Sequence, residues 1–144
     1  MAGWIETFRG VVFPYQCDHQ GHMNVMHYMG MFDQGGWHMM HACGVGAGAI
    51  AAGRGFVSAK DTIEYLIELH AGALVVIRGG VGRIGTTSVT LVQRMVNVES
   101  GALVARCETI AVHFDLVART KLPITDDIRA RLNQHLVDPV GTEP

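Results

Sequence analysis

The sequence has little charge, and the charge it has is not clustered. Only 17% of its 144 residues are charged, the formal net charge is −2, and the Lys and Arg residues are scattered singly. Proteins that bind nucleic acids or anionic membrane surfaces usually carry a dense basic patch. We therefore expect no nucleic-acid partner and no membrane partner.

Long apolar runs and closely spaced cysteines are also missing. An Arg, Asp, Glu or His interrupts every hydrophobic segment before it reaches the ~20 residues that span a bilayer. The three cysteines, Cys17, Cys43 and Cys107, are an odd number, and residues 1–6 lack the basic and apolar regions of a signal peptide. These absences predict a soluble, cytoplasmic protein with reduced thiols.

Hydrophobic residues and glycine are abundant instead. Hydrophobic residues make up 49% of the chain, which is enough for one compact domain spanning residues 1–144. Several of the 18 glycines fall within an expected helix or strand. Glycine destabilises such elements, so its presence there often marks a close backbone approach. We expect a helix that packs closely on a sheet.

The order of the expected elements indicates an α+β fold. An extended segment covers residues 5–16, a polar turn covers 18–23, and a helix capped by Asn24 runs to about Cys43, where Gly44 ends it. A connector rich in glycine and alanine follows over 44–55. Strands are expected over 61–70, 74–84, 88–98 and 103–114, and a second helix over 126–136. The later turns are too short for crossover helices, so these strands should be antiparallel.

The first helix is apolar over most of its circumference. Its apolar stripe consists of Val25, Met29, Phe32, Gly36, Met39, Met40 and Cys43, and it is widened by Tyr28, Met31 and Trp37. In the next segment Ile63, Tyr65, Ile67 and Leu69 alternate with mostly polar residues, as in a half-buried strand. These patterns predict a sheet that wraps around a central helix.

Groups suited to acyl transfer meet just before this helix. Asp18 offers a carboxylate, His22 offers an imidazole, and the helix that begins after Asn24 offers free backbone N–H donors. In isolation, a turn aspartate more often only binds nearby backbone N–H groups. The chemistry therefore depends on the context of the whole motif.

That motif resembles the signature of a known family. The pattern Asp-x-x-Gly-His-x-Asn-x-x-x-Tyr, formed by Asp18, Gly21, His22, Asn24 and Tyr28, is similar to that of hotdog-fold acyl-CoA thioesterases of the 4-hydroxybenzoyl-CoA thioesterase type. The resemblance covers most of the chain. It implies a five-stranded antiparallel sheet wrapped around a long central helix, an acyl-CoA substrate and no cofactor beyond the CoA of that substrate. It also implies a homodimer or homotetramer whose active sites use residues of two subunits.

The resemblance also implies roles for individual residues. Asp18 would be the nucleophile or general base, and the backbone N–H of Val25 would bind the developing oxyanion. His22 would orient Asp18 or the substrate, or would only satisfy the turn. Asn24 is expected chiefly as a helix cap, and the Tyr28 hydroxyl would approach the acyl group unless the ring only packs.

Other sites are less consistent with the sequence. The histidines His19, His22, His27, His38 and His41 suggest a metal site, but no His-Glu-x-x-His motif supports it, so no metal is predicted. No Gly-x-Ser-x-Gly motif is present either. Asp33, Glu64 and Glu68 are alternative carboxylates, although exposed salt bridges explain them more simply.

Two other functions remain open. A non-catalytic acyl-CoA binding module would keep the fold without needing Asp18, and a hotdog dehydratase or hydratase would carry a different motif on the helix. Among acyl groups, small to medium ones are expected, because Phe32 and Trp37 would occupy the volume that a long chain needs.

Overall fold

The computed structural model describes residues 3–140 of the chain. The elements, in chain order, are β1 (Ile5–Val11), a 3₁₀ turn (Pro14–Gln16), α1 (Val25–Ala42), α2 (Ala47–Ala51), β2 (Arg54–Tyr65), β3 (Leu74–Ile84), β4 (Ser88–Asn97), β5 (Leu103–Asp115), β6 (Thr120–Lys121) and α3 (Asp126–Asn133). Of the described helices, none is long and apolar enough to cross a membrane.

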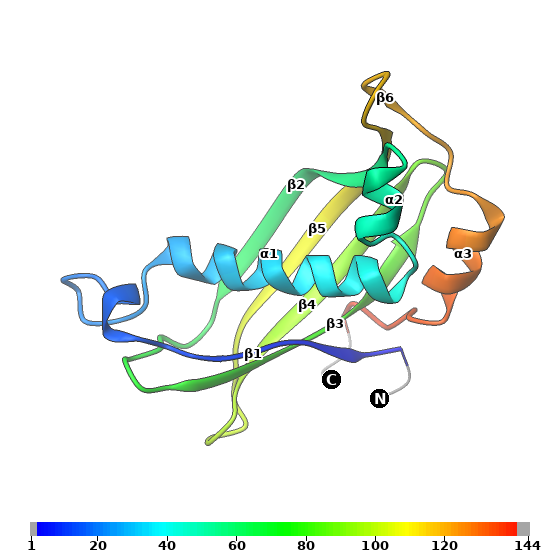
Figure 1. Ribbon diagram of the computed structural model, residues 1–144. Helices are drawn as coiled ribbons and strands as arrows, with labels where there is room; N and C mark the ends of the chain where they lie inside the picture. The colour runs from blue at the N-terminus through cyan, green and yellow to red at the C-terminus, as the bar shows by residue number, and fades with distance from the viewer. Residues whose placement is uncertain (1–2, 141–144) are drawn as a thin grey trace.

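A curled antiparallel sheet packs against α1. The strand order is β1-β3-β4-β5-β2, and the two-residue β6 pairs with the end of β5. Figure 1 shows α1 lying across one face of this sheet, with α2 and α3 beyond its C-terminal end. The predicted α+β hotdog fold, with five strands around a long helix, is confirmed. β6 is an addition that the sequence did not predict.

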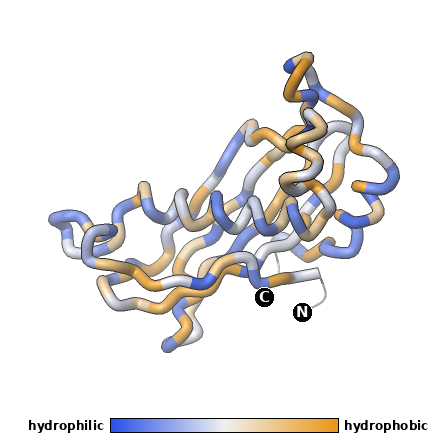
Figure 2. Tube along the Cα trace, in the orientation of Figure 1, coloured by the Kyte–Doolittle hydropathy of each residue, from blue (hydrophilic) through white to orange (hydrophobic). Residues whose placement is uncertain are grey.

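The core lies between α1 and the sheet in two clusters. Tyr28, Met31 and Phe32 pack with β3 and β4 residues near the start of α1, and Met39 and Met40 pack with a second group near its end. Figure 2 shows hydrophobic residues along much of the sheet, whereas the turn before α1 is polar. This polar turn is the segment that carries the candidate chemistry.

A close approach of helix and sheet occurs where glycine predicts it. Gly35 is buried on α1, and a Cβ there would collide with the Gln93 side chain of β4. The Gln93 amide donates to the carbonyl of Phe32 at 2.8 Å. The small residue therefore lets a buried polar side chain from the sheet bind the helix backbone.

Two strand boundaries differ from the prediction. β1 ends at Val11 rather than at residue 16, because Pro14 begins a 3₁₀ turn. β2 covers 54–65 rather than 61–70, since it pairs with β5 from Arg54 opposite Asp115 to Tyr65 opposite Ala105. The alternation of apolar residues continues past Tyr65, but the backbone N–H groups of 66 and 67 both donate to the carbonyl of Val104 there. The strand has already ended at that point.

The buried faces of both helices also differ in part from the prediction. Val25 and Trp37 are 56% and 53% exposed, so α1 is not covered on all sides within one chain. The last helix ends at Asn133, not at residue 136, and Leu136 is 45% exposed. Leu132 of this helix is fully buried.

Candidate active site

A closed polar turn leads into α1. The Asp18 N–H donates to the carbonyl of His22 at 3.1 Å, and the Gly21 N–H donates back to the carbonyl of Asp18 at 3.0 Å. Gly21 has a φ of +92°, a conformation that side chains other than glycine rarely adopt. Cys17 and Met23 form an isolated antiparallel bridge at the base of the turn. The turn thus holds Asp18 close to the helix start.

Asn24 connects the carboxylate of Asp18 to the helix. Its Oδ1 accepts from the N–H of Met26 at 3.0 Å, which confirms the predicted N-cap. Its Nδ2 donates to Asp18 Oδ2 at 2.9 Å, and the Gln20 N–H donates to Oδ1 at 2.8 Å. The bond from Asn24 and then that from Gln20 hold the pKa of Asp18 below its usual value. The carboxylate is therefore an anion at neutral pH.

The backbone N–H of Val25 is available at the start of α1. As the first helical residue, Val25 has no partner within the helix, and none of residues 3–140 accepts a hydrogen bond from it. The helix macrodipole adds partial positive charge at this end. A cavity of about 230 Å³ lies beside it, lined by His22, Met23, Val25, Tyr28, Tyr65, Leu66, Ile67 and Glu68. Asp18 is not part of this lining in a single chain.

Tyr28 forms one wall of the cavity. The residue is 3% exposed, and its ring meets that of Tyr65 edge to face, with centroids 5.1 Å apart. Burial raises the pKa of Tyr28 above its usual value, so the phenol stays neutral. Packing against Tyr65 thus fixes the Tyr28 ring at the edge of the cavity beside Val25.

His22 faces Glu68 rather than Asp18. Its Nε2 lies 3.9 Å from Glu68 Oε2, and the other oxygen of Glu68 lies 3.4 Å from Nε2 of His70. Nδ1 of His70 is 2.9 Å from the carbonyl of Gly21, which can only accept, so that nitrogen carries the proton. Within the described residues, no hydrogen bond joins the imidazole of His22 to the carboxylate of Asp18.

His70 thus links the loop after β2 to the turn over residues 18–23. Sequence reasoning missed this contact, because it placed 66–70 in a strand. The alternation of hydrophobic residues gave no signal that the segment leaves the sheet.

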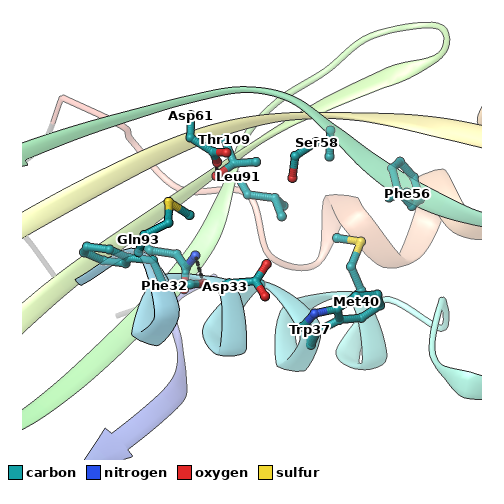
Figure 3. A pocket seen from close by; sticks show the side chains of 13 residues that line it. Phe32, Asp33, Trp37, Met40, Phe56, Ser58, Asp61, Leu91, Gln93 and Thr109 are labelled. Atoms are coloured by element: carbon teal, nitrogen blue, oxygen red, sulfur yellow. Dashed lines mark hydrogen bonds between the residues drawn. The ribbon is translucent and has the colours of Figure 1, made fainter. Parts of the chain in front are cut away.

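A second pocket, of about 60 Å³, lies further along α1. Figure 3 shows Asp33 and Trp37 on the helix, with Ser58 and Asp61 of β2 and Thr109 of β5 on the opposite side. The Thr109 hydroxyl donates to Asp61 Oδ1 at 2.5 Å. Sequence reasoning considered Asp33 but missed the residues of β2 and β5.

The alternative carboxylates have different surroundings. Glu64 forms an exposed ion pair with Arg106, at 2.8 Å between Oε1 and Nε, as the simpler explanation predicted. Glu68 lies between two imidazoles, as described above. Among residues 3–140, Asp33 has neither a hydrogen bond nor an ion pair. Within the same residues, no group of three or more His, Cys, Asp or Glu side chains is arranged to hold a metal ion.

Known proteins resemble this chain in sequence family and in fold. The model of the thioesterase-like superfamily matches residues 12–132, whereas no curated protein matches. A predicted thioesterase from Bacillus stearothermophilus is 25% identical, with a TM-score of 0.78 over 92% of this chain and 98% of that one. A Staphylococcus aureus protein in complex with CoA is 15% identical, with a TM-score of 0.85 over 97% and 90%. The probable thioesterase YbaW from Escherichia coli is 20% identical, with a TM-score of 0.77 over 90% and 98%.

Proposed function

Because this chain belongs to the thioesterase-like superfamily, we propose that it is an acyl-CoA thioesterase. It takes an acyl-CoA and water to a carboxylate and free CoA. One observation carries the proposal: the ionised carboxylate of Asp18 is fixed by Asn24 next to a helix start whose Val25 N–H has no partner among the described residues. A base or nucleophile and an oxyanion donor are the two groups that thioester hydrolysis requires.

The proposed chemistry begins at the thioester carbonyl. Asp18 either attacks the carbonyl carbon and displaces the CoA thiolate, leaving an anhydride that water opens, or takes a proton from the water that attacks. In both routes negative charge builds on the carbonyl oxygen. The Val25 N–H and the helix dipole stabilise that charge in the transition state. The route through Asp18 uses neither a metal nor an organic cofactor.

We also propose that the working unit is a homodimer or homotetramer. Asp18 does not line the cavity beside Val25 in one chain, and the neighbouring side chains of Leu66 and Ile67 are 44% and 49% exposed. A second chain laid against this region would cover these side chains and complete the site. The S. aureus protein of the same fold was solved with CoA, which supports acyl-CoA as the ligand class here.

The acyl group should be small to medium in size, and the enzyme should act in the cytoplasm. Phe32 and Trp37 line the pocket further along α1, where their rings occupy volume that a long acyl chain would need. All three cysteines are free, which is consistent with a reducing compartment.

A panel of short, branched, long and aromatic acyl-CoA thioesters, read by thiol release, tests the proposal. We expect hydrolysis, with small to medium acyl groups preferred. A clear preference for palmitoyl-CoA over every shorter thioester would contradict the expected size. Binding of acyl-CoA without hydrolysis of any thioester would instead indicate a non-catalytic binding module.

A further inference from the structure

The pocket between α1 and β2 combines acidic and aromatic side chains. Asp33 enters it from the helix and Asp61 from the strand, on opposite sides of the space. The aromatic residues Phe32, Trp37 and Phe56 belong to the same lining, with Phe32 buried, Phe56 stacked on His113 and Trp37 half exposed. An apolar acyl group would need the aromatic surface but not the two carboxylates.

No positive charge of the described chain neutralises this pocket. Within residues 3–140, neither Asp33 nor Asp61 forms an ion pair, and no Lys, Arg or His belongs to the lining. Among the described residues, the only hydrogen-bond partner of the Asp61 side chain is the hydroxyl of Thr109, which carries no charge. The pocket therefore presents two solvent-exposed carboxylates beside the accessible ring of Trp37.

Carboxylates and aromatic faces together attract organic cations. A quaternary ammonium or protonated amine gains from ring faces through cation–π attraction and from carboxylates through charge. Trp is the strongest of the aromatic partners, and Trp37 is half exposed, so its ring is accessible. A neutral aliphatic group of the same shape gains neither interaction.

We propose that this pocket recognises the positively charged end of a short acyl group, so that the substrate is a CoA thioester of an ammonium-bearing carboxylic acid. The inference rests on the proposed thioesterase function, since the reacting carbonyl is placed at Val25. Met29 lies one helical turn after Val25 and belongs to the lining of the pocket that contains Asp33. The two pockets thus follow one another along α1 and β2.

The length of the acyl group follows from the helix geometry. Asp33 lies eight positions after Val25, which corresponds to a rise of roughly 12 Å along the axis of α1. The Asp33 side chain leans toward the helix start, and contact with a bulky ammonium group takes up part of the remaining distance. An acyl chain of about four to six carbons with a terminal ammonium spans the remaining distance between Val25 and the Asp33 carboxylate.

Two thioesters of the same shape test the proposal. The cationic probe is 4-(trimethylammonio)butanoyl-CoA, and its neutral isostere is 5,5-dimethylhexanoyl-CoA. We expect kcat/KM for the cation to exceed that for the isostere by roughly tenfold. Asp33→Asn and Asp61→Asn should each lower this ratio, and the double variant should bring it close to one. Glu99→Gln, a remote exposed carboxylate, should leave the ratio at the wild-type value.

The outcomes separate this inference from the proposed function. Turnover of the isostere with a wild-type ratio of one or less would overturn the charged substrate but keep the thioesterase. The charged substrate would also be overturned if the double variant kept the wild-type ratio of kcat/KM for the cation to that for the isostere. The same holds if Asp33→Asn lost turnover of the isostere while this ratio stayed unchanged. If neither thioester is hydrolysed, calorimetry with 4-(trimethylammonio)butanoate decides: binding that weakens in the double variant supports the cation site, and absent or unchanged binding refutes it.

Discussion

The amide of Asn24 holds the carboxylate of Asp18 at the start of α1, with 2.9 Å between Nδ2 and Oδ2. The same side chain caps the helix through its oxygen, at 3.0 Å from the N–H of Met26. One residue therefore fixes both the candidate base and the helix start that is proposed to supply the oxyanion donor. The proposed mechanism thus couples catalysis to local stability at this position.

Replacing Asp18 with Asn should remove most of the turnover. The amide keeps the shape of the side chain but can neither attack a thioester nor accept a proton as a base, so we expect a loss of about 10²–10⁴-fold in kcat. Binding of acyl-CoA should survive, because its energy is spread over a long ligand. Thiol-release kinetics and calorimetry measure the two effects, and normal hydrolysis by the variant would refute the mechanism.

Two substitutions of Asn24 should separate its two contacts. Asn24→Ala removes the cap and the bond to Asp18, and we expect about 1 kcal/mol less stability together with slower turnover. Asn24→Ser keeps a capping oxygen but loses the amide donor, so its stability should stay near wild type while turnover still falls. Urea unfolding and thiol-release assays measure these effects. If both variants lost the same stability, loss of the cap could not be the cause of the destabilisation by Asn24→Ala.

The pH dependence should follow the lowered pKa of Asp18. A carboxyl whose pKa is lower in the folded than in the unfolded chain stabilises the fold above the unfolded pKa, and this contribution is lost as pH falls through the folded value. Asp18 should therefore stay ionised at pH 5–8 and cause no loss of activity there. NMR of its carboxyl carbon should show a higher pKa in Asn24→Ala, because the largest lowering contact is gone. An unchanged pKa would contradict the assigned cause.

The polar turn and the Asn24 cap were predicted correctly because both depend on residues that are close in sequence. The bond from Asn24 to the Asp18 carboxylate, across six residues, was not predicted. The contact of Thr109 with Asp61 spans 48 residues, and its existence depends on the register of β2 against β5. The predicted strand began at residue 61, whereas β2 begins at Arg54. The hydrophobic pattern therefore did not predict that Asp61 and Thr109 lie side by side.

The cysteines should differ in reactivity. Burial raises the pKa of the Cys43 and Cys107 thiols to about 11, whereas Cys17 is only partly buried. The thiolate is the reactive form, so iodoacetamide at pH 8 should label Cys17 first and reach the other two only on unfolding. Mass spectrometry of the native and urea-treated protein measures this difference. Rapid native labelling of Cys43 would contradict its burial.

Self-association should be visible in sedimentation at micromolar concentration. β2 ends the strand order, so one of its edges has no strand partner among the described residues, and unpaired edges favour pairing with another chain. Ile67, just after β2, is 49% exposed beside the cavity at Val25. A charge at this position should weaken association, so we expect Ile67→Glu to shift the protein toward monomer and to lower turnover. Val117→Glu places the same charge at an 83% exposed position in the turn between β5 and β6, and it should sediment like wild type. A wild-type monomer with full activity would show that one chain completes the site alone.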